Sequence, residues 1–224
     1  MKNIVLVHGA FADGLSYAKI IPLLEAKGYH VTAVQNLLTS LADDVAATKR
    51  ALAQQDGPVL LVGHSWGSMV ISNAGNDPKV AGLVYIAADP DPNQSLGELT
   101  KNAPTVGLKQ IKANDGFLSL TPQRINEDFT QDLTPTERKV IIATQQPVAA
   151  AFGEKMATAA WQPKPSWYIV ASQHHMISPA LEAEMTGRIK ATTLTLNTSH
   201  VPMLSQPEKV AAFIESAAKK APVK

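Results

Sequence analysis

The chain has 224 residues, of which 45% are hydrophobic and 17% charged, and its formal net charge is +1. These values fit one globular domain with a substantial core, and they argue against nucleic acids and anionic membranes as partners. The absence of cysteine excludes disulfides, thiolate metal sites and a cysteine nucleophile. No apolar run approaches the about 18 residues needed to cross a bilayer, and the run after Met1 lacks the features of a signal peptide. We therefore expect a cytoplasmic protein, although a removed leader is not excluded.

Six apolar runs of strand length alternate with helical patterns along the chain. Most of the runs are continuous, which is typical of strands buried on both faces of a parallel sheet. The predicted strands are residues 3–8, 30–34, 58–63, 80–87, 166–171 and 192–196. The predicted helices are residues 16–27, 41–55, 68–76, 179–190 and 206–219. The alternation predicts an α/β fold with a doubly wound, mostly parallel six-stranded sheet.

The stretch from 89 to 165 breaks this rhythm, because no strand is expected there. Helical pieces are predicted at residues 97–101, 122–129, 135–144 and 148–157. A long helical excursion between two strands is typical of an inserted cap, so residues 1–88 and 166–224 form the predicted core and residues 89–165 the helical cap. Its large apolar side chains either line a substrate pocket or pack the cap onto the core; they are Phe117, Phe129, Phe152 and Met156.

The sequence Gly63-His64-Ser65-Trp66-Gly67 lies between the third predicted strand and the helix that follows. A G-x-S-x-G pattern in this context is typical of a nucleophilic serine on a sharp turn, where flanking glycines avoid steric clashes. The helix N-terminus would favour developing negative charge. The alternative is a tight turn with an incidental serine. The context favours Ser65 as a nucleophile.

Two further motifs follow the first and last predicted strands. In His8-Gly9-Ala10-Phe11-Ala12-Asp13-Gly14, the Ala10 N–H could form an oxyanion hole with that of Trp66, and Phe11 would flank an acyl pocket. The alternative is a simple glycine-rich turn; the motif does not match a dinucleotide site. His200 stands late in the chain, where a general base is expected, although a lone loop histidine is often incidental.

Together these motifs resemble the α/β-hydrolase family, in the small esterase branch of plant methylesterases and hydroxynitrile lyases. The stretches that carry the resemblance are IVLVHGAFADG, VLLVGHSWGS, YIVAS with MISPALEAEM, and TSHVPMLSQP. The resemblance implies Ser65 as nucleophile, His200 as general base, and Ala10 and Trp66 as oxyanion donors. His64, beside the serine, is expected to be structural or to border the pocket. The implied activity is hydrolysis of a small, fairly apolar carboxylic ester by a monomer or homodimer, without cofactor or metal.

The acid of a catalytic triad is the one expected residue that is missing. The family usually has aspartate three residues before an isoleucine in the loop after the fifth predicted strand; here His174 precedes Ile177. A neutral His174 could accept a hydrogen bond from His200 and fix its tautomer. Three alternatives remain: Asp89, or its neighbour Asp91, substitutes for the acid; a Ser–His dyad works alone; or the protein is a weakly catalytic binding receptor.

Two other site chemistries are alternatives to ester hydrolysis: a metal site and a carbon–carbon lyase. A metal site at His174 and His175 is disfavoured because adjacent residues of an extended loop point apart and no third ligand has suitable spacing. A lyase would use the same serine and histidine for carbon–carbon cleavage. The resemblance then implies a cap lysine, for which the candidates are Lys101, Lys109 and Lys112.

Overall fold

A computed structural model describes residues 1–93, 95, 98, 101, 104–108, 111–149 and 154–222. Its central sheet has six strands in the order β2-β1-β3-β4-β8-β9, and every neighbouring pair is parallel. The prediction of a doubly wound parallel sheet is confirmed, with strand ends shifted by a residue or less. The strands are β1 (Asn3–Val7), β2 (His30–Val34), β3 (Val59–His64), β4 (Val80–Ile86), β8 (Ser166–Ala171) and β9 (Thr192–Leu196).

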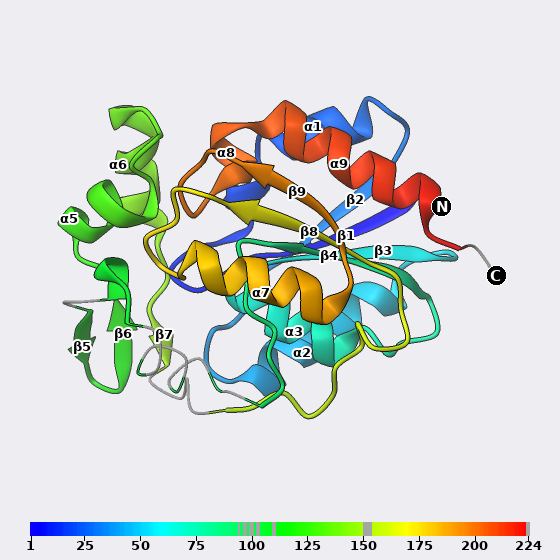
Figure 1. Ribbon diagram of the computed structural model, residues 1–224, viewed down its shortest axis with the longest axis horizontal. Coiled ribbons are helices and arrows are strands. Elements are labelled where there is room, and N and C mark those ends of the chain that lie inside the picture. Colours follow the sequence, from blue (N-terminus) through cyan, green and yellow to red (C-terminus); the bar gives the residue numbers. More distant parts are fainter. Residues whose placement is uncertain are drawn as a thin grey trace.

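Helices cover both faces of this sheet, with α1 and α9 on one face and α2, α3 and α7 on the other (Figure 1). The first predicted helix, 16–27, is shorter than expected, because its start is a 3-10 turn, η1 (Gly14–Tyr17). The helices of the core are α1 (Ile20–Glu25), α2 (Leu41–Ala53), α3 (Trp66–Ala74), α7 (Pro179–Ile189), α8 (Pro202–Ser205) and α9 (Pro207–Lys220).

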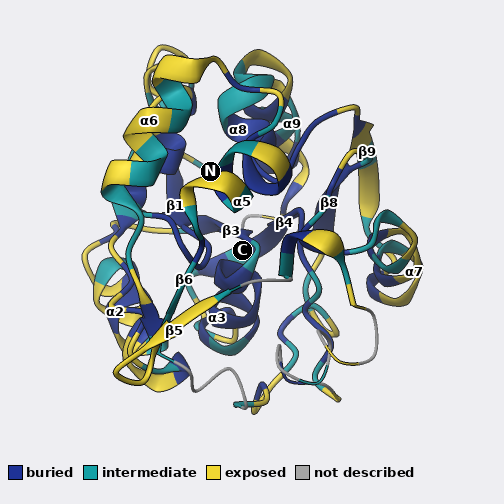
Figure 2. Ribbon diagram, turned by 90° about the vertical axis from the view of Figure 1, so that its left-hand side faces the viewer, coloured by how far each residue is buried: buried dark blue, intermediate teal, exposed yellow. Residues whose placement is uncertain are grey.

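The core lies along the central strands, which are dark blue in Figure 2. Every residue of β1, β3 and β8 is buried, as the continuous apolar runs predict. The edge strands β2 and β9 are partly exposed. Several of their positions hold threonine or alanine in place of large apolar residues, as expected for edge strands that are partly open to solvent.

The segment between β4 and β8 differs from the all-helical prediction. It contains a small antiparallel sheet in the order β5-β6-β7, so the expectation of no strands is wrong. Asp115 and Gly116 have φ values of 48° and 76°, which is the geometry of a two-residue hairpin turn. The elements are η2 (Val106–Leu108), β5 (Lys112–Asn114), β6 (Phe117–Ser119), α5 (Pro122–Arg124), the π-helical turn η3 (Ile125–Phe129), α6 (Pro135–Thr144) and β7 (Val148–Ala149).

Of the four helices predicted in this segment, those at 122–129 and 135–144 are found. The other two are not confirmed. The prediction of a helix at 148–157 is wrong, because Val148 and Ala149 pair with β6. Most of the predicted helix 97–101, and residues 150–153, lie outside the described residues.

The carboxyl ends of the parallel strands point toward the segment between β4 and β8, which we name the inserted segment (Figure 1). The loops that follow β1, β3, β8 and β9 therefore meet at this end of the sheet, beneath α5, η3 and α6. In a parallel α/β sheet, ligands bind outside the carboxyl ends of the strands. Within the described ranges, no helix is long and apolar enough to cross a membrane.

Candidate active site

Ser65 occupies a strained turn between β3 and α3. Its φ of 49° and ψ of −120° are unfavourable for a residue with a Cβ atom. The flanking glycines make the turn possible. A Cβ on Gly63 would lie 2.6 Å from the Gly67 carbonyl oxygen, and a Cβ on Gly67 would collide with the carbonyl of Val7. The serine itself is partly exposed, in a surrounding of buried residues.

The loop after β1 packs directly against this turn. A Cβ on Gly9 would lie 2.9 Å from the Cβ of Ser65, so only glycine allows this approach. His8 holds the loop: its Nε2 accepts a hydrogen bond from the Asn36 N–H at 2.9 Å, and its Nδ1 lies 2.9 Å from the Gly9 carbonyl. Ala10 follows at once and is buried, and Trp66 opens α3 on the other side of Ser65. One predicted oxyanion donor, Trp66, is thus the residue after Ser65, and the other, Ala10, follows the glycine that packs against Ser65.

Trp66 is fixed by a buried carboxylate that the sequence reasoning missed. Its indole Nε1 donates to Asp44 Oδ2 at 2.8 Å, and Asp44 Oδ1 accepts from the N–H groups of Leu37 and Leu38 at 2.7 and 3.0 Å. Asp44 is fully buried in α2. No local pattern could have assigned this role, because the contacts come from the loop after β2 and from α3.

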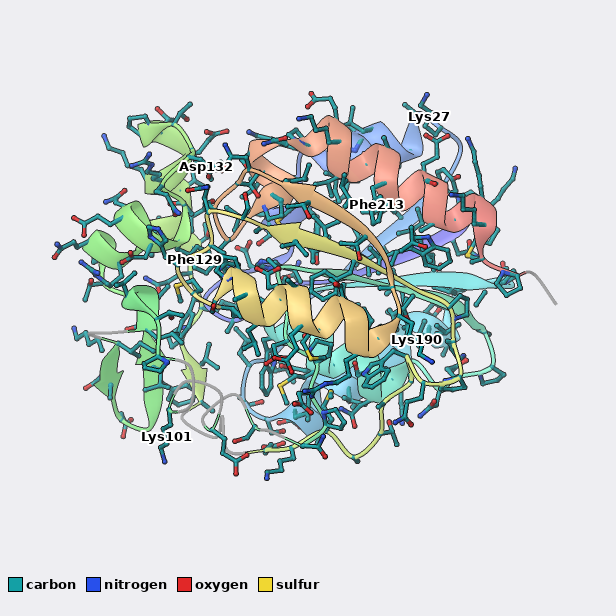
Figure 3. All side chains as sticks on the ribbon, in the orientation of Figure 1. Lys27, Lys101, Phe129, Asp132, Lys190 and Phe213 are labelled. Carbon is teal, nitrogen blue, oxygen red and sulfur yellow. The ribbon has the colours of Figure 1, made fainter. Side chains whose placement is uncertain are left out.

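His200 lies in the loop after β9, and three contacts position it. His64 Nε2 donates to the His200 carbonyl at 2.8 Å, and the ring of Phe129 lies edge-on at 4.8 Å between centroids. The neighbouring Ser199 N–H donates to Asp132 Oδ2 at 2.8 Å. Figure 3 shows Phe129 and Asp132 on the inserted segment, where it faces the strand ends. Burial, with help from nearby His174 and His64, lowers the pKa of His200 well below its usual value.

His174 lies against the ring of His200. Its Nε2 is 2.5 Å from His200 Nδ1, and its Nδ1 is 2.9 Å from the backbone nitrogens of both Met176 and Ile177. Burial, with help from His64, lowers the pKa of His174 to about 3, so the ring is neutral. The expected pairing with His200 is present. The expectation that His174 accepts a hydrogen bond from His200 is not supported, however. The N–H groups of Met176 and Ile177 both donate to Nδ1, which leaves the proton of His174 on Nε2.

Glu182 is a buried carboxyl group that the sequence reasoning also missed. Its Oε1 lies 3.9 Å from His174 Nε2 and has no hydrogen-bond partner among the described residues, while Oε2 accepts from the Ala171 N–H at 3.3 Å. Burial raises its pKa well above the usual value. Because burial favours the neutral form of both groups, the contact with His174 is not an ion pair.

Asp89 is not brought to His200. The nitrogen that an acid would contact, His200 Nδ1, faces His174 instead. Burial and the nearby Asp91 raise the pKa of Asp89 to about 7, and Asp91 itself pairs with Arg188. Within the described part of the chain, neither aspartate forms a hydrogen bond with His200 or His174. Substitution of the missing acid by Asp89 stays a prediction that no contact supports.

Several predicted pocket and site residues lie elsewhere. His64 is fully buried and holds the backbone of His200, so it does not line an open pocket. Phe117 lies on β6 and is 40% exposed, and Phe152 lies outside the described residues. His175 is partly exposed, and its Nδ1 lies 3.1 Å from Asp128 Oδ1.

Two of the three lysines proposed for a lyase lie at the surface. Lys101 and Lys112 are exposed, and Figure 3 shows Lys101 well apart from Phe129. Lys109 lies outside the described residues. Nor do His, Asp or Glu side chains gather in threes to hold a metal ion in the ranges that the structure describes.

A mostly apolar cavity of about 250 Å³ lies between η1 and α6. Its wall includes Phe129, whose ring contacts His200, and Val201, the next residue along the chain. Phe11 is buried, and the residues that follow it contribute to the wall. The complete lining is Ala12, Asp13, Leu15, Ser16, Ala18, Lys19, Phe129, Glu137, Val140, Ile141, Thr144, Val201 and Leu204.

A serine on a strained strand–turn–helix junction and a buried histidine in the loop after the last strand are typical of an α/β-hydrolase. Residues 4–213 match the alpha/beta hydrolase family, and the chain belongs to this family. A pyrethroid hydrolase of Sphingobium wenxiniae is 31% identical over 248 residues, covering 96% of this chain and 86% of that protein. Methylesterase 8 of Arabidopsis thaliana is 24% identical, covering 92% and 86%. The crystal structure of polyneuridine aldehyde esterase shares the fold, with a TM-score of 0.85, 22% identity, and 97% and 99% coverage. The chain is thus an enzyme of the hydrolase class, in the esterase branch expected from its motifs.

Proposed function

We propose that this enzyme hydrolyses a small, fairly apolar carboxylic ester, with Ser65 as nucleophile and His200 as proton acceptor. The observation that carries this proposal is the strained backbone of Ser65. Such strain persists only where the surrounding structure enforces it, and it occurs mostly at functional sites. The names of the relatives, a hydrolase and a methylesterase, support an ester as the substrate class.

The chemistry follows the acyl-enzyme route. Ser65 Oγ attacks the ester carbonyl and its proton passes to His200, while the N–H groups of Ala10 and Trp66 stabilise the oxyanion. His200 then protonates the leaving alcohol. Water attacks the acyl-enzyme, His200 takes its proton, and the carboxylic acid product leaves with Ser65 restored. Neither a cofactor nor a metal is needed for these steps.

The cavity between η1 and α6 supports an apolar substituent on the substrate. Its volume of about 250 Å³ is slightly below the usual range of ligand sites, which suits a small group, and its wall is mostly carbon. Phe129 lines this cavity, and its ring also contacts the ring of His200. We infer that the apolar acyl or alkyl group lies between η1 and α6, with the ester carbonyl at Ser65.

A matched pair of serine variants tests the proposal. Ser65→Ala removes the nucleophile, whereas Ser68→Ala removes a buried hydroxyl of the same helix that has no partner in the described structure. With 4-nitrophenyl butyrate as substrate, we expect Ser65→Ala to abolish turnover and Ser68→Ala to keep it. Equal turnover by Ser65→Ala and the unaltered enzyme would disprove the proposed nucleophile.

A further inference from the structure

The hydrogen bonds of His174 determine which of its nitrogens carries the proton. Nδ1 faces two backbone donors, the N–H groups of Met176 and Ile177, both at 2.9 Å. An N–H nitrogen cannot accept these bonds, so Nδ1 is the unprotonated nitrogen. A neutral imidazole has one N–H, which must therefore be on Nε2.

The proton on His174 Nε2 determines the tautomer of His200. The two nitrogens that meet, His174 Nε2 and His200 Nδ1, are 2.5 Å apart. Since His174 donates, His200 Nδ1 accepts, and the single proton of neutral His200 is on its Nε2. Because Nδ1 lies against His174, Nε2 is also the only nitrogen of His200 that can receive a proton from Ser65.

We propose that His174 is a positioning residue of reversed polarity: it holds His200 in the tautomer whose Nε2 is already protonated and cannot act as a base. This inference rests on the proposed function of His200. A triad acid does the opposite, because it accepts from Nδ1–H and leaves the lone pair of Nε2 facing the serine. The enzyme reaches its reactive form only when the proton arrangement of the His174–His200 pair is reversed.

The loop that carries His174 is fixed from two sides, so Nδ1 does not turn away from its donors freely. Thr105 Oγ1 donates to the Met176 carbonyl at 2.9 Å, and the Gly107 N–H donates to the His175 carbonyl at 3.0 Å. From the other side, Gln131 Nε2 donates to the Gln173 carbonyl at 2.7 Å. Reversing the pair would place a protonated Nδ1 against two N–H groups, which leaves buried donors without acceptors.

Glu182 does not restore the missing acid through His174. Such a relay needs His174 to accept at Nε2 and carry its proton on Nδ1, which the two backbone donors oppose. The carboxyl group of Glu182 is 3.9 Å from Nε2, and burial raises its pKa and so favours its neutral form. The Glu182→Gln variant keeps an oxygen for the Ala171 N–H and removes the acid, so it separates a relay from our proposal.

The same loop is well suited to a carboxylate. The N–H groups of Met176 and Ile177 would donate to an aspartate at position 174, which would also accept from His200 Nδ1–H. His174→Asn is the matched neutral variant: its amide oxygen satisfies the backbone donors, and its NH₂ group faces His200. We expect His174→Asp to reverse the tautomer of His200 and His174→Asn to leave it unchanged.

Nitrogen-15 NMR of the imidazole rings tests the tautomer without reference to activity. In the unaltered protein at pH 7.5 we expect His200 to show a protonated Nε2 and an unprotonated Nδ1, with the signal assigned by its loss in His200→Gln. The His174→Asp variant should show the opposite pattern. A protonated Nδ1 on His200 in the unaltered protein would overturn the inference, and this measurement holds even if a variant fails to fold.

Kinetics provide the second readout. We expect His174→Asp to raise kcat by roughly 10²- to 10⁴-fold, His174→Asn to give no such gain, and Glu182→Gln to change kcat by no more than about threefold. An equal gain in His174→Asn, or a large loss in Glu182→Gln, would contradict the proposal. If NMR shows the expected tautomers but no variant turns over an ester, the tautomer assignment stands and the proposed hydrolysis fails.

Discussion

The carboxylate of Asp132 accepts a hydrogen bond from the backbone N–H of Ser199 at 2.8 Å, and this bond ties the inserted segment to the loop of His200. A second tie runs from Gln131 to the loop of His174. Residues 125–133 therefore bind both histidine loops, and Phe129 among them packs against the ring of His200. The inserted segment helps to determine the geometry of the two histidines as well as covering the site.

Replacing Asp132 tests this tie. Asp132→Ala removes the acceptor of the Ser199 N–H, and we expect kcat/KM to fall about tenfold because the loop of His200 loses its position. The free energy of unfolding should fall by only about 1 kcal/mol, since one hydrogen bond at a partly exposed residue is lost. Asp132→Asn keeps an acceptor oxygen and should retain most activity. Equal losses in both variants would show that the charge, and not the hydrogen bond, matters.

The second prediction concerns the glycine after the serine turn. Gly67→Ala places a Cβ against the carbonyls of Val7 and His8, the latter at 2.8 Å, and backbone cannot move aside cheaply. We expect a loss of at least about 1–3 kcal/mol in urea unfolding, together with loss of ester turnover. Gly187→Ala is the control, because its Cβ meets nothing within 4 Å inside helix α7. That variant should unfold at the same or higher urea concentration; a matching loss there would refute the steric argument.

Stability should depend on pH with a maximum near neutrality. Burial lowers the pKa of four histidines in the folded protein, to about 4 for His64 and about 3 for His174. The unfolded chain takes up protons near pH 6.5 and the folded chain does not, so this stability is complete above 6.5 and is lost as pH falls. The loss is about 1.4 kcal/mol per pH unit for each fully buried histidine. The other two histidines are His8 and His200.

Two buried acids act in the opposite direction. The raised pKa values of Glu182 and Asp89 stabilise the folded state at low pH, and this contribution is lost as pH rises through their folded pKa values. Between pH 4.5 and 6.5 the four histidines outweigh the two acids, so stability should rise with pH; above 6.5 it should decline. Urea unfolding from pH 4.5 to 9 measures the profile. Glu182→Gln should flatten the alkaline decline, and a steady rise up to pH 9 would contradict the assignment.

Filling the cavity tests where the apolar group of the substrate binds. Thr144→Phe on α6 places a ring into the cavity, whereas Thr136→Phe makes the same change at an exposed position of that helix outside the lining. We expect Thr144→Phe to raise KM about tenfold for a 4-nitrophenyl octanoate and to change it little for the acetate. Thr136→Phe should affect neither ester. Parallel effects on both esters in Thr144→Phe would place the apolar group elsewhere.

Much of the fold follows from local sequence signals. Buried parallel strands appear as continuous apolar runs, and the glycines around Ser65 mark a turn that other residues cannot form. The hairpin at Asp115-Gly116 has the expected Asp-Gly signal, but the apolar pattern of the sequence does not predict its strands. These strands are three residues long and mostly exposed. Strands so short carry too little apolar pattern to be distinguished from loop.

The site was predictable only in part. The positions of Ser65, His174 and His200 follow from motifs, but the direction of the hydrogen bond between the histidines does not. It depends on two backbone N–H groups in the loop and on the burial of Glu182, which are properties of the folded chain. The contacts of Asp44 and Asp132 likewise join elements far apart in sequence.

The strained backbone of Ser65 has an evolutionary consequence. Glycine adopts a positive φ without penalty, whereas serine there costs of the order of 1–3 kcal/mol, a sizeable share of the 5–15 kcal/mol that stabilises a typical domain. A descendant of this chain released from catalysis would gain stability by replacing Ser65 with glycine. Selection for folding alone therefore opposes this serine, and the nucleophilic role that we propose for its hydroxyl would offset that pressure.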